Sequence, residues 1–171
     1  IIAFSDIPLQ HLPPTHASSV IWNDMTAGGS TAMGAAFSLA KGVIENKDIL
    51  PSRAYKPTLV LVSDGQPTDD WQRQLESLIA EGRSSKCYFM AMGIGKNPGI
   101  NVLERFISHT PVLAEVDGTP IRNTVFRASD ADKIHEFFRK VTMSVTVRSK
   151  SINPNAVPAS NRVDPKEDDY W

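Results

Sequence analysis

Two short polar loops carry the residues that are best suited to hold a small, hard ligand. The first, at residues 26–36, brings the hydroxyls of Ser30 and Thr31 to the start of an expected helix through a flexible glycine turn. The second places Ser63 and Asp64 directly after the apolar run 59–62. In open α/β sheets, the carboxyl end of a strand is where ligands bind. Asp64 is therefore a candidate metal or phosphate position, and both loops could face one cation.

Alternating strands and helices are expected to position these loops. The apolar runs 59–62 and 87–92 lack alternation and are too short for ordinary helices, which indicates buried strands. Apolar residues recur at helical spacing over three other segments, 33–44, 71–79 and 102–107, which predicts helices there. The sequence predicts an α/β fold in which strand 59–62 is a central parallel strand with both faces covered.

The two ends of the chain add less regular elements. Residues 1–4 are expected to form a strand that follows further sequence upstream. Pro8 begins a segment that is expected at the edge of a sheet. Residues 112–116 are expected to form a strand that turns at 117–118 and returns over 121–126. Ser129 is the expected N-cap of a last helix. Residues 150–171 contain many polar residues and the prolines Pro154, Pro158 and Pro165, which is typical of a polar C-terminal tail or linker.

Composition limits the classes of function. The chain has 171 residues, of which 41% are hydrophobic, enough for one globular domain. With 18 basic and 19 acidic residues, it has no net field that favours nucleic acid or an anionic membrane. No apolar run approaches the roughly 20 residues that span a bilayer. Cys87 is the single cysteine and is expected in the core, which favours a reducing compartment and a cytoplasmic protein.

Other motifs do not support a cofactor site or an active site. The glycines of residues 93–99 match neither a dinucleotide fingerprint nor a Walker A loop. The four histidines lack zinc-site spacing, and no G-x-S-x-G elbow is present. Asp69 and Asp70 have two interpretations: they cap the helix that follows them, or they join Asp64 in gathering cations.

The two polar loops also carry a family resemblance. The pairing of Gly28-Gly29-Ser30-Thr31 with Val62-Ser63-Asp64-Gly65 resembles the von Willebrand factor A (vWA) domain, over residues 1–149. The sequences of residues 26–36 and 63–71 are similar to those of the bacterial tellurium-resistance-type branch of this family. The resemblance implies a doubly wound, mostly parallel sheet with helices on both faces and one antiparallel edge strand, as in vWA and Rossmann-like folds.

The resemblance also implies a metal-ion-dependent adhesion site. Members build it from a D-x-S-x-S loop, a threonine and an aspartate, and here Thr31 and Asp64 match the second and third parts, with Ser30 and Ser63 as possible supporting ligands. The implied ion is Mg²⁺, with Mn²⁺ or Ca²⁺ as alternatives. Hydroxyls and few carboxylates leave such an ion under-neutralised, so an acidic side chain of a protein partner completes its shell.

One part of the family pattern is missing. No D-x-S-x-S occurs in the chain, and neither does the strand that should precede it. In the family that strand lies between the strands at 1–4 and 59–62, so both would lose a ladder partner, at about 1–3 kcal/mol for each unsatisfied buried group. We expect that upstream sequence or another segment supplies this strand, and that metal binding by residues 1–171 alone is weakened.

Three functions remain open at this stage. The first is a non-enzymatic, divalent-metal-dependent protein-binding module within a bacterial stress-response complex, as the resemblance implies. The second is a Mg²⁺-dependent phosphoryl-transfer or hydrolytic enzyme that uses Asp64, Asp69 and Asp70. The third is a scaffold whose metal site is vestigial.

Overall fold

A computed structural model describes residues 1–110, 114–116, 119–121 and 123–150 of the chain. Over these residues the fold is α/β, with four α-helices, two short 3₁₀ helices and seven strands. The elements in chain order are β1 (Ile2–Phe4), β2 (Pro8–Gln10), η1 (Ala17–Ser19), α1 (Met33–Glu45), β3 (Thr58–Ser63), α2 (Gln72–Ala80), η2 (Ser84–Lys86), β4 (Tyr88–Ile94), α3 (Ile100–Ile107), β5 (Ala114–Val116), β6 (Thr119–Ile121), β7 (Phe126–Ala128) and α4 (Ala131–Lys150).

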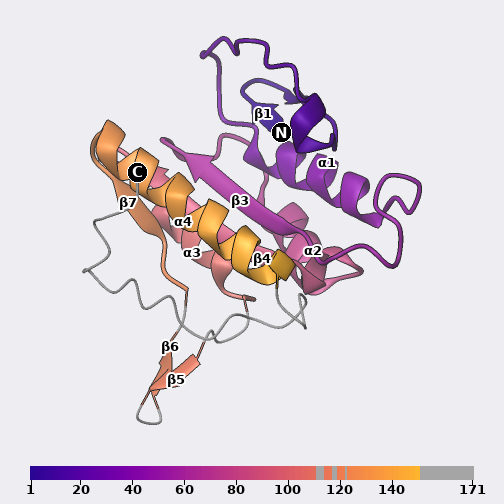
Figure 1. The fold of residues 1–171 in the computed structure, drawn as a ribbon. Helices are drawn as coiled ribbons and strands as arrows, with labels where there is room; N and C mark the ends of the chain where they lie inside the picture. The colour runs from indigo at the N-terminus through magenta and orange to yellow at the C-terminus, as the bar shows by residue number, and fades with distance from the viewer. Residues whose placement is uncertain (111–113, 117–118, 122, 151–171) are drawn as a thin grey trace.

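A three-stranded parallel sheet, in the order β3-β4-β7, lies at the centre of the fold. Side chains of β4 alternate between its faces. Cys87 at its entry, Phe89 and Ala91 pack with α1, α2 and α3, while Tyr88, Met90 and Met92 pack with Phe137 of α4. Figure 1 shows α4 crossing one face of this sheet and the other helices behind it. Helices therefore cover both faces, as expected.

The position of β3 differs from the expectation. Residues 59–62 were predicted to form a central strand, but among the described residues β3 pairs with β4 alone and lies at the edge of the sheet. Most of its side chains are only half-buried. The absence of alternation reflects apolar packing on both faces, where Leu59 and Leu61 belong to one apolar cluster and Val60 and Val62 pack against the other. Packing on the faces does not determine pairing along the strand edges.

The N-terminal strands form a separate antiparallel pair. β1 and β2 pair with each other, which confirms the edge strand expected at Pro8. They do not join the sheet of β3 over the described residues, so the antiparallel edge implied by the family resemblance stands here as a two-stranded sheet of its own.

Two C-terminal expectations need correction. The strand from 121 to 126 is two strands: β6 pairs with β5 in an antiparallel hairpin that projects from the body, and β7 joins β4 in parallel (Figure 1). Residues 112–113 and the turn at 117–118 lie outside the described residues, as does the tail beyond Lys150. The cap of α4 is Asp130, not Ser129, because Asp130 Oδ1 accepts the Lys133 backbone N–H at 2.9 Å.

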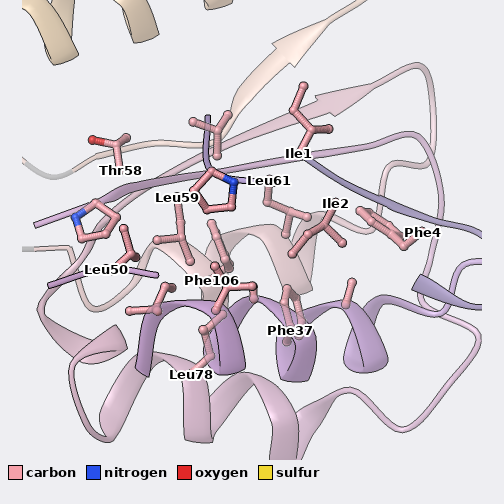
Figure 2. Close-up of a pocket in the computed structure, with 17 residues that line it drawn as sticks. Ile1, Ile2, Phe4, Phe37, Leu50, Thr58, Leu59, Leu61, Leu78 and Phe106 are labelled. Carbon is pink, nitrogen blue, oxygen red and sulfur yellow. The ribbon is translucent and has the colours of Figure 1, made fainter. Parts of the chain in front are cut away.

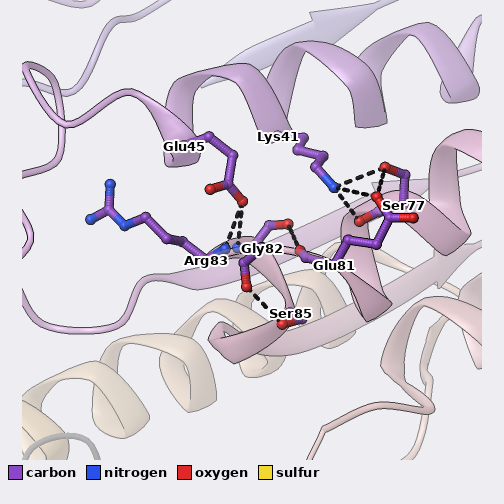
Figure 3. A network of polar contacts seen from close by, with 8 residues as sticks. Lys41, Glu45, Ser77, Glu81, Gly82, Arg83 and Ser85 are labelled. Atoms are coloured by element: carbon purple, nitrogen blue, oxygen red, sulfur yellow. Dashed lines mark hydrogen bonds and ion pairs between the residues drawn. The ribbon is translucent and has the colours of Figure 1, made fainter.

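Polar contacts hold α1 against α2 and the segment that follows α2 (Figure 3). Lys41 Nζ donates to the Ser77 carbonyl at 2.6 Å and forms an ion pair with Glu81 at 3.2 Å. Glu45 accepts the backbone N–H groups of Arg83 and Ser84 at 2.7 and 3.0 Å. These bonds fix the orientation of α1, whose opposite end forms part of the candidate site. No described helix is both long and apolar enough to cross a membrane.

Cys87 lies in the core, as expected, and its thiol should be inert in the folded protein. The residue is 3% exposed, and burial raises the pKa of its thiol to about 12. We expect no reaction with a disulfide reagent at pH 8 until urea unfolds the chain, measured by absorbance. Because the folded pKa exceeds the unfolded value of about 8.5, the stability linked to the neutral thiol is complete below pH 8.5 and is lost as pH rises towards 12. Rapid labelling without denaturant would contradict this packing.

Candidate metal-binding site

Two loops predicted from sequence meet at the carboxyl end of β3. The backbone N–H of Thr31 donates to Thr68 Oγ1 at 2.9 Å, and the N–H of Thr68 donates to the Thr31 carbonyl at 3.0 Å. Gly65, the residue after Asp64, lies so close that a Cβ there would sit 3.6 Å from Thr31 Oγ1. The fold thus brings Thr31 and the Asp64 turn together.

The four predicted ligands differ in how free their oxygens are. Asp64 is exposed and Thr31 is half-buried, so both reach solvent. Ser30 is exposed as well, and its backbone N–H is bonded to Asp6. Ser63 is buried, and its hydroxyl donates to the Gly65 carbonyl at 3.1 Å. Ser63 shapes the turn that carries Asp64, while Asp64 and Thr31 present oxygens to the outside.

Asp69 caps a helix, but a different one from the helix expected. Its Oδ1 and Oδ2 accept the backbone N–H groups of Gly34 and Ala35 at 3.0 and 2.9 Å, at the first turn of α1. The N-cap position of α1 is Ala32, which has no side chain able to cap, so a carboxylate from a distant loop takes that role. α2 follows Asp69 in the sequence, and its N-cap Trp71 makes no side-chain capping bond. The capping interpretation assigned Asp69 to the wrong helix.

This capping gives a prediction that separates Asp69 from Asp70. Asp69→Ala is expected to lower the free energy of unfolding by about 1–2 kcal/mol, because two N–H groups of α1 lose their partner. Asp70→Ala removes an exposed carboxylate and is expected to change stability by less than about 0.5 kcal/mol. Urea unfolding followed by circular dichroism measures both values, and equal effects would show that the cap is not important.

The loop after β4 supports the Asp64 turn from the other side. Gln66 Nε2 donates to Asn97 Oδ1 at 3.2 Å. Gly99, the N-cap of α3, has a φ of +68° and lies where a Cβ would come within 2.8 Å of the Gly65 carbonyl. Only glycine combines this left-handed backbone with so close an approach. The glycine-rich stretch 93–99 thus has a structural role next to the site.

Asp6 is a residue of this region that sequence reasoning missed. Its Oδ1 accepts the Ser30 backbone N–H at 2.8 Å, and this bond holds the pKa of the carboxyl below its ordinary value. A Cβ on Gly29 would lie 2.8 Å from Asp6 Oδ2, so the carboxylate lies directly against the glycine turn. The pattern that revealed Asp64, a carboxylate just after a strand, also applies to Asp6 after β1.

The oxygen donors suit a small, hard cation better than a transition metal. Asp64 contributes a carboxylate and Thr31 a hydroxyl, and oxygen-only sets of this kind are typical of Mg²⁺, Mn²⁺ and Ca²⁺. Within the described ranges no three His, Cys, Asp or Glu side chains converge. A cation held by Thr31 and Asp64 would therefore keep positions for water or for an acidic group of another molecule.

Comparison with known proteins assigns neither a family nor a function to this chain. No family model, curated protein or solved structure matches this chain. Its function is therefore inferred from the geometry and chemistry of the loops themselves.

Proposed function

We propose that this chain is a non-enzymatic, divalent-metal-dependent protein-binding module with a vWA-like, doubly wound fold, acting in a bacterial stress-response complex. The observation that carries the proposal is the approach of the Thr31 hydroxyl to the turn after Asp64, within 3.6 Å of the Cβ position of Gly65. The two residues belong to loops 33 positions apart in sequence, yet two hydrogen bonds hold these loops together. The Thr31 N–H donates to Thr68 Oγ1, and the Thr68 N–H donates to the Thr31 carbonyl.

The chemistry of the site favours binding through a shared cation. One carboxylate and one hydroxyl neutralise only part of a divalent charge, so a Mg²⁺ held by Asp64 and Thr31 retains affinity for an anionic ligand. An aspartate or glutamate of a partner protein supplies such a ligand. The role of the metal is then to join two proteins, and no bond of a substrate has to be made or broken.

The engagement of Asp69 supports binding over hydrolysis. A hydrolytic centre built on Asp64, Asp69 and Asp70 needs its carboxylates free to share cations. Both oxygens of Asp69 accept backbone N–H groups of α1. With Asp69 engaged, Asp64 and Thr31 offer a carboxylate and a hydroxyl, which is a set for ligation.

The test is direct titration of the ion. Mn²⁺ binding, followed by electron paramagnetic resonance, is expected to weaken at least tenfold in Asp64→Ala, which corresponds to about 1.4 kcal/mol. Asp70→Ala, which removes an exposed carboxylate from the same loop, is the matched control and should bind Mn²⁺ as the native chain does. A glutamate-containing peptide should bind only when Mg²⁺ is present.

Two other results would overturn the proposal. Absence of Mn²⁺ binding by residues 1–171, both alone and with a D-x-S-x-S strand fused ahead of Ile1, would identify a scaffold with a vestigial site. Phosphoester hydrolysis that requires Mg²⁺ and disappears in Asp64→Ala would instead identify a metal-dependent enzyme.

A further inference from the structure

The loop after β4 presents an exposed cation beside the turn that carries Asp64. β3 and β4 are parallel and pair as far as Ser63 and Gly93, so their carboxyl ends lie side by side. Lys96 follows β4 by two residues and is exposed. Over the described ranges its ammonium forms no ion pair or hydrogen bond. The flexible four-carbon stem of a lysine allows this charge to reach a group bound at the end of the neighbouring strand.

The loop 95–99 has a fixed shape because it is held on both sides. On the side of β7, the Gly95 N–H donates to the Ala128 carbonyl at 3.0 Å. Pro98 is buried against β4, so closely that a Cβ on Gly93 would lie 2.6 Å from Pro98 Cγ. The backbone that carries Lys96 is therefore ordered before any partner arrives, which lowers the entropic cost of binding there.

Asn97 adds a neutral donor next to Lys96. Gln66 Nε2 donates to Asn97 Oδ1 at 3.2 Å, so the oxygen of this amide is engaged by the loop of Asp64. Asn97 is exposed, and its Nδ2 group has no partner among the residues that the structure describes. A carboxylate can accept from an ammonium and from an amide N–H at the same time. Lys96 and Asn97 thus form a pair of donors suited to a carboxylate.

An apolar groove between β1 and β3 offers no alternative place for a carboxylate. Figure 2 shows its lining, which includes Ile2, Phe37 and Leu61. The groove has a volume of about 370 Å³, and none of the described side chains that line it carries a charge. A carboxylate that entered it would lose its hydration without compensation. A second acidic side chain of a partner would therefore bind at the surface.

Two other cations near this end of the sheet are less well placed. Arg127 is exposed on β7, but β4 separates β7 from β3 and from Asp64. Lys133 already forms an ion pair with Glu136 at 2.8 Å. Lys96 is the cation whose loop contacts the turn after Asp64, and Arg127 serves as a comparison for the experiment.

The spacing of the two strand ends suits an extended peptide. Neighbouring strands are about 4.8 Å apart, and alternate side chains of an extended chain point to the same side at intervals of about 6.8 Å. The stem of Lys96 can cover the difference between these two spacings. A peptide that places one carboxylate on a cation at Asp64 would thus bring the carboxylate two residues away to Lys96.

We propose that Lys96 and Asn97 bind a second carboxylate of the partner protein, two residues along the partner chain from the carboxylate that binds the cation. This inference rests on the proposed function and deepens it. The partner segment is extended and carries acidic side chains at alternate positions. The cation provides binding to an acidic residue, and Lys96 selects the segments that have two.

Fluorescence anisotropy of labelled peptides in saturating Mg²⁺ tests the proposal. One peptide has two glutamates separated by an alanine, and two others have glutamine in place of one glutamate or the other. The two-acid peptide is expected to bind about fivefold more tightly than either single-acid peptide, the upper range for a solvent-exposed ion pair. A peptide with adjacent glutamates directs them to opposite sides and should gain little. The preference should decrease as salt is added.

Variants of the loop assign the preference to its residues. Lys96→Met should remove the advantage of the two-acid peptide and leave the affinity for single-acid peptides unchanged. Asn97→Asp keeps an oxygen for Gln66 but replaces the donor by a negative charge, so it should also remove the advantage. Lys47→Met, at an exposed position after the far end of α1, is the matched control and should retain the advantage.

Mn²⁺ titration without peptide separates this inference from the proposed function. It is made on residues 1–171 and on the form with a D-x-S-x-S strand fused ahead of Ile1, and the peptides are tested on the form that binds Mn²⁺. Lys96→Met should bind Mn²⁺ as the native sequence does, whereas Asp64→Ala should bind it more weakly. If neither form binds Mn²⁺, or if Mn²⁺ binds but no peptide does, the proposed function and this inference are both wrong.

Three results would overturn this inference alone. They are equal affinity of two-acid and single-acid peptides in a chain that binds Mn²⁺, the same gain from adjacent glutamates, and loss of the preference in Arg127→Met but not in Lys96→Met. The first would limit recognition to the acidic residue on the cation. The second would show attraction without a defined geometry, and the third would assign the second carboxylate to β7.

Discussion

Gly34→Ala is expected to lower the free energy of unfolding by about 2 kcal/mol. Gly34 lies in the first turn of α1, where a Cβ would come within 2.6 Å of the Asp70 carbonyl and 2.8 Å of Trp71 Cα. Both are backbone atoms, so the helix and the loop must move apart, and overpacking of this kind costs about 1–3 kcal/mol. The movement also lengthens the two hydrogen bonds to Asp69, which adds to the loss.

Gly42→Ala is the matched control for this prediction. Gly42 lies in the same helix, and a Cβ there has no neighbour within 4 Å. Removing a helical glycine at an open position should raise stability by about 0.5–1 kcal/mol. Urea unfolding of the two variants should therefore give changes of opposite sign. A stabilised Gly34→Ala would show that α1 does not lie against the loop 69–71.

Arg148→Met is expected to cost about 2–3 kcal/mol. Arg148 is a buried cation of α4: its Nη1 donates to Thr58 Oγ1 at 2.6 Å, its Nη2 donates to the Lys56 carbonyl at 2.9 Å, and its guanidinium lies 5.4 Å from the ring centre of Tyr88. Methionine keeps most of the apolar stem but leaves the Thr58 and Lys56 oxygens without the guanidinium. A hydrogen bond to a charged group contributes about 1.5–3 kcal/mol net. The neutral methionine also removes the cost of burying the guanidinium charge, which offsets part of the loss of two such bonds.

An exposed arginine of the same helix serves as the comparison. Arg139→Met changes the same charge at an exposed position and should alter the free energy of unfolding by less than about 0.5 kcal/mol. Thermal unfolding of both variants, at equal salt, separates packing of Arg148 from a general effect of charge. Equal melting temperatures would mean that the end of α4 contributes little to holding the helix on the sheet.

Much of the fold follows from the sequence because β3, β4 and their helices are specified locally. Continuous apolar runs identified both strands, and helical spacing identified α1, α2 and α3 to within a few residues. The prediction for the hairpin region was wrong because its structure depends on non-local pairing. Residues 121–126 have turn and strand propensity, yet whether the chain continues the hairpin or joins β4 depends on a distant strand edge.

In the candidate site, too, local patterns predicted some residues, while contacts between distant residues were not predictable. A carboxylate after an apolar strand was enough to select Asp64, and a glycine turn before a helix was enough to select Thr31. The partner of Asp69 was not predictable, because the helix it caps begins 36 residues earlier, at Met33, and no local pattern links the two. Asp6 was overlooked because its role is to fix the backbone of Ser30.

The capping of α1 from a distance has a consequence for the order of folding. A helix that carries its own cap can begin to form as soon as its residues are free, but the first turn of α1 lacks one until β3 and the loop 64–69 are in place. A peptide of residues 31–46 should therefore be weakly helical in water. In the intact chain, α1 should gain its amide protection only after β3 and β4 have paired, so the helix beside Thr31 is a late product of folding.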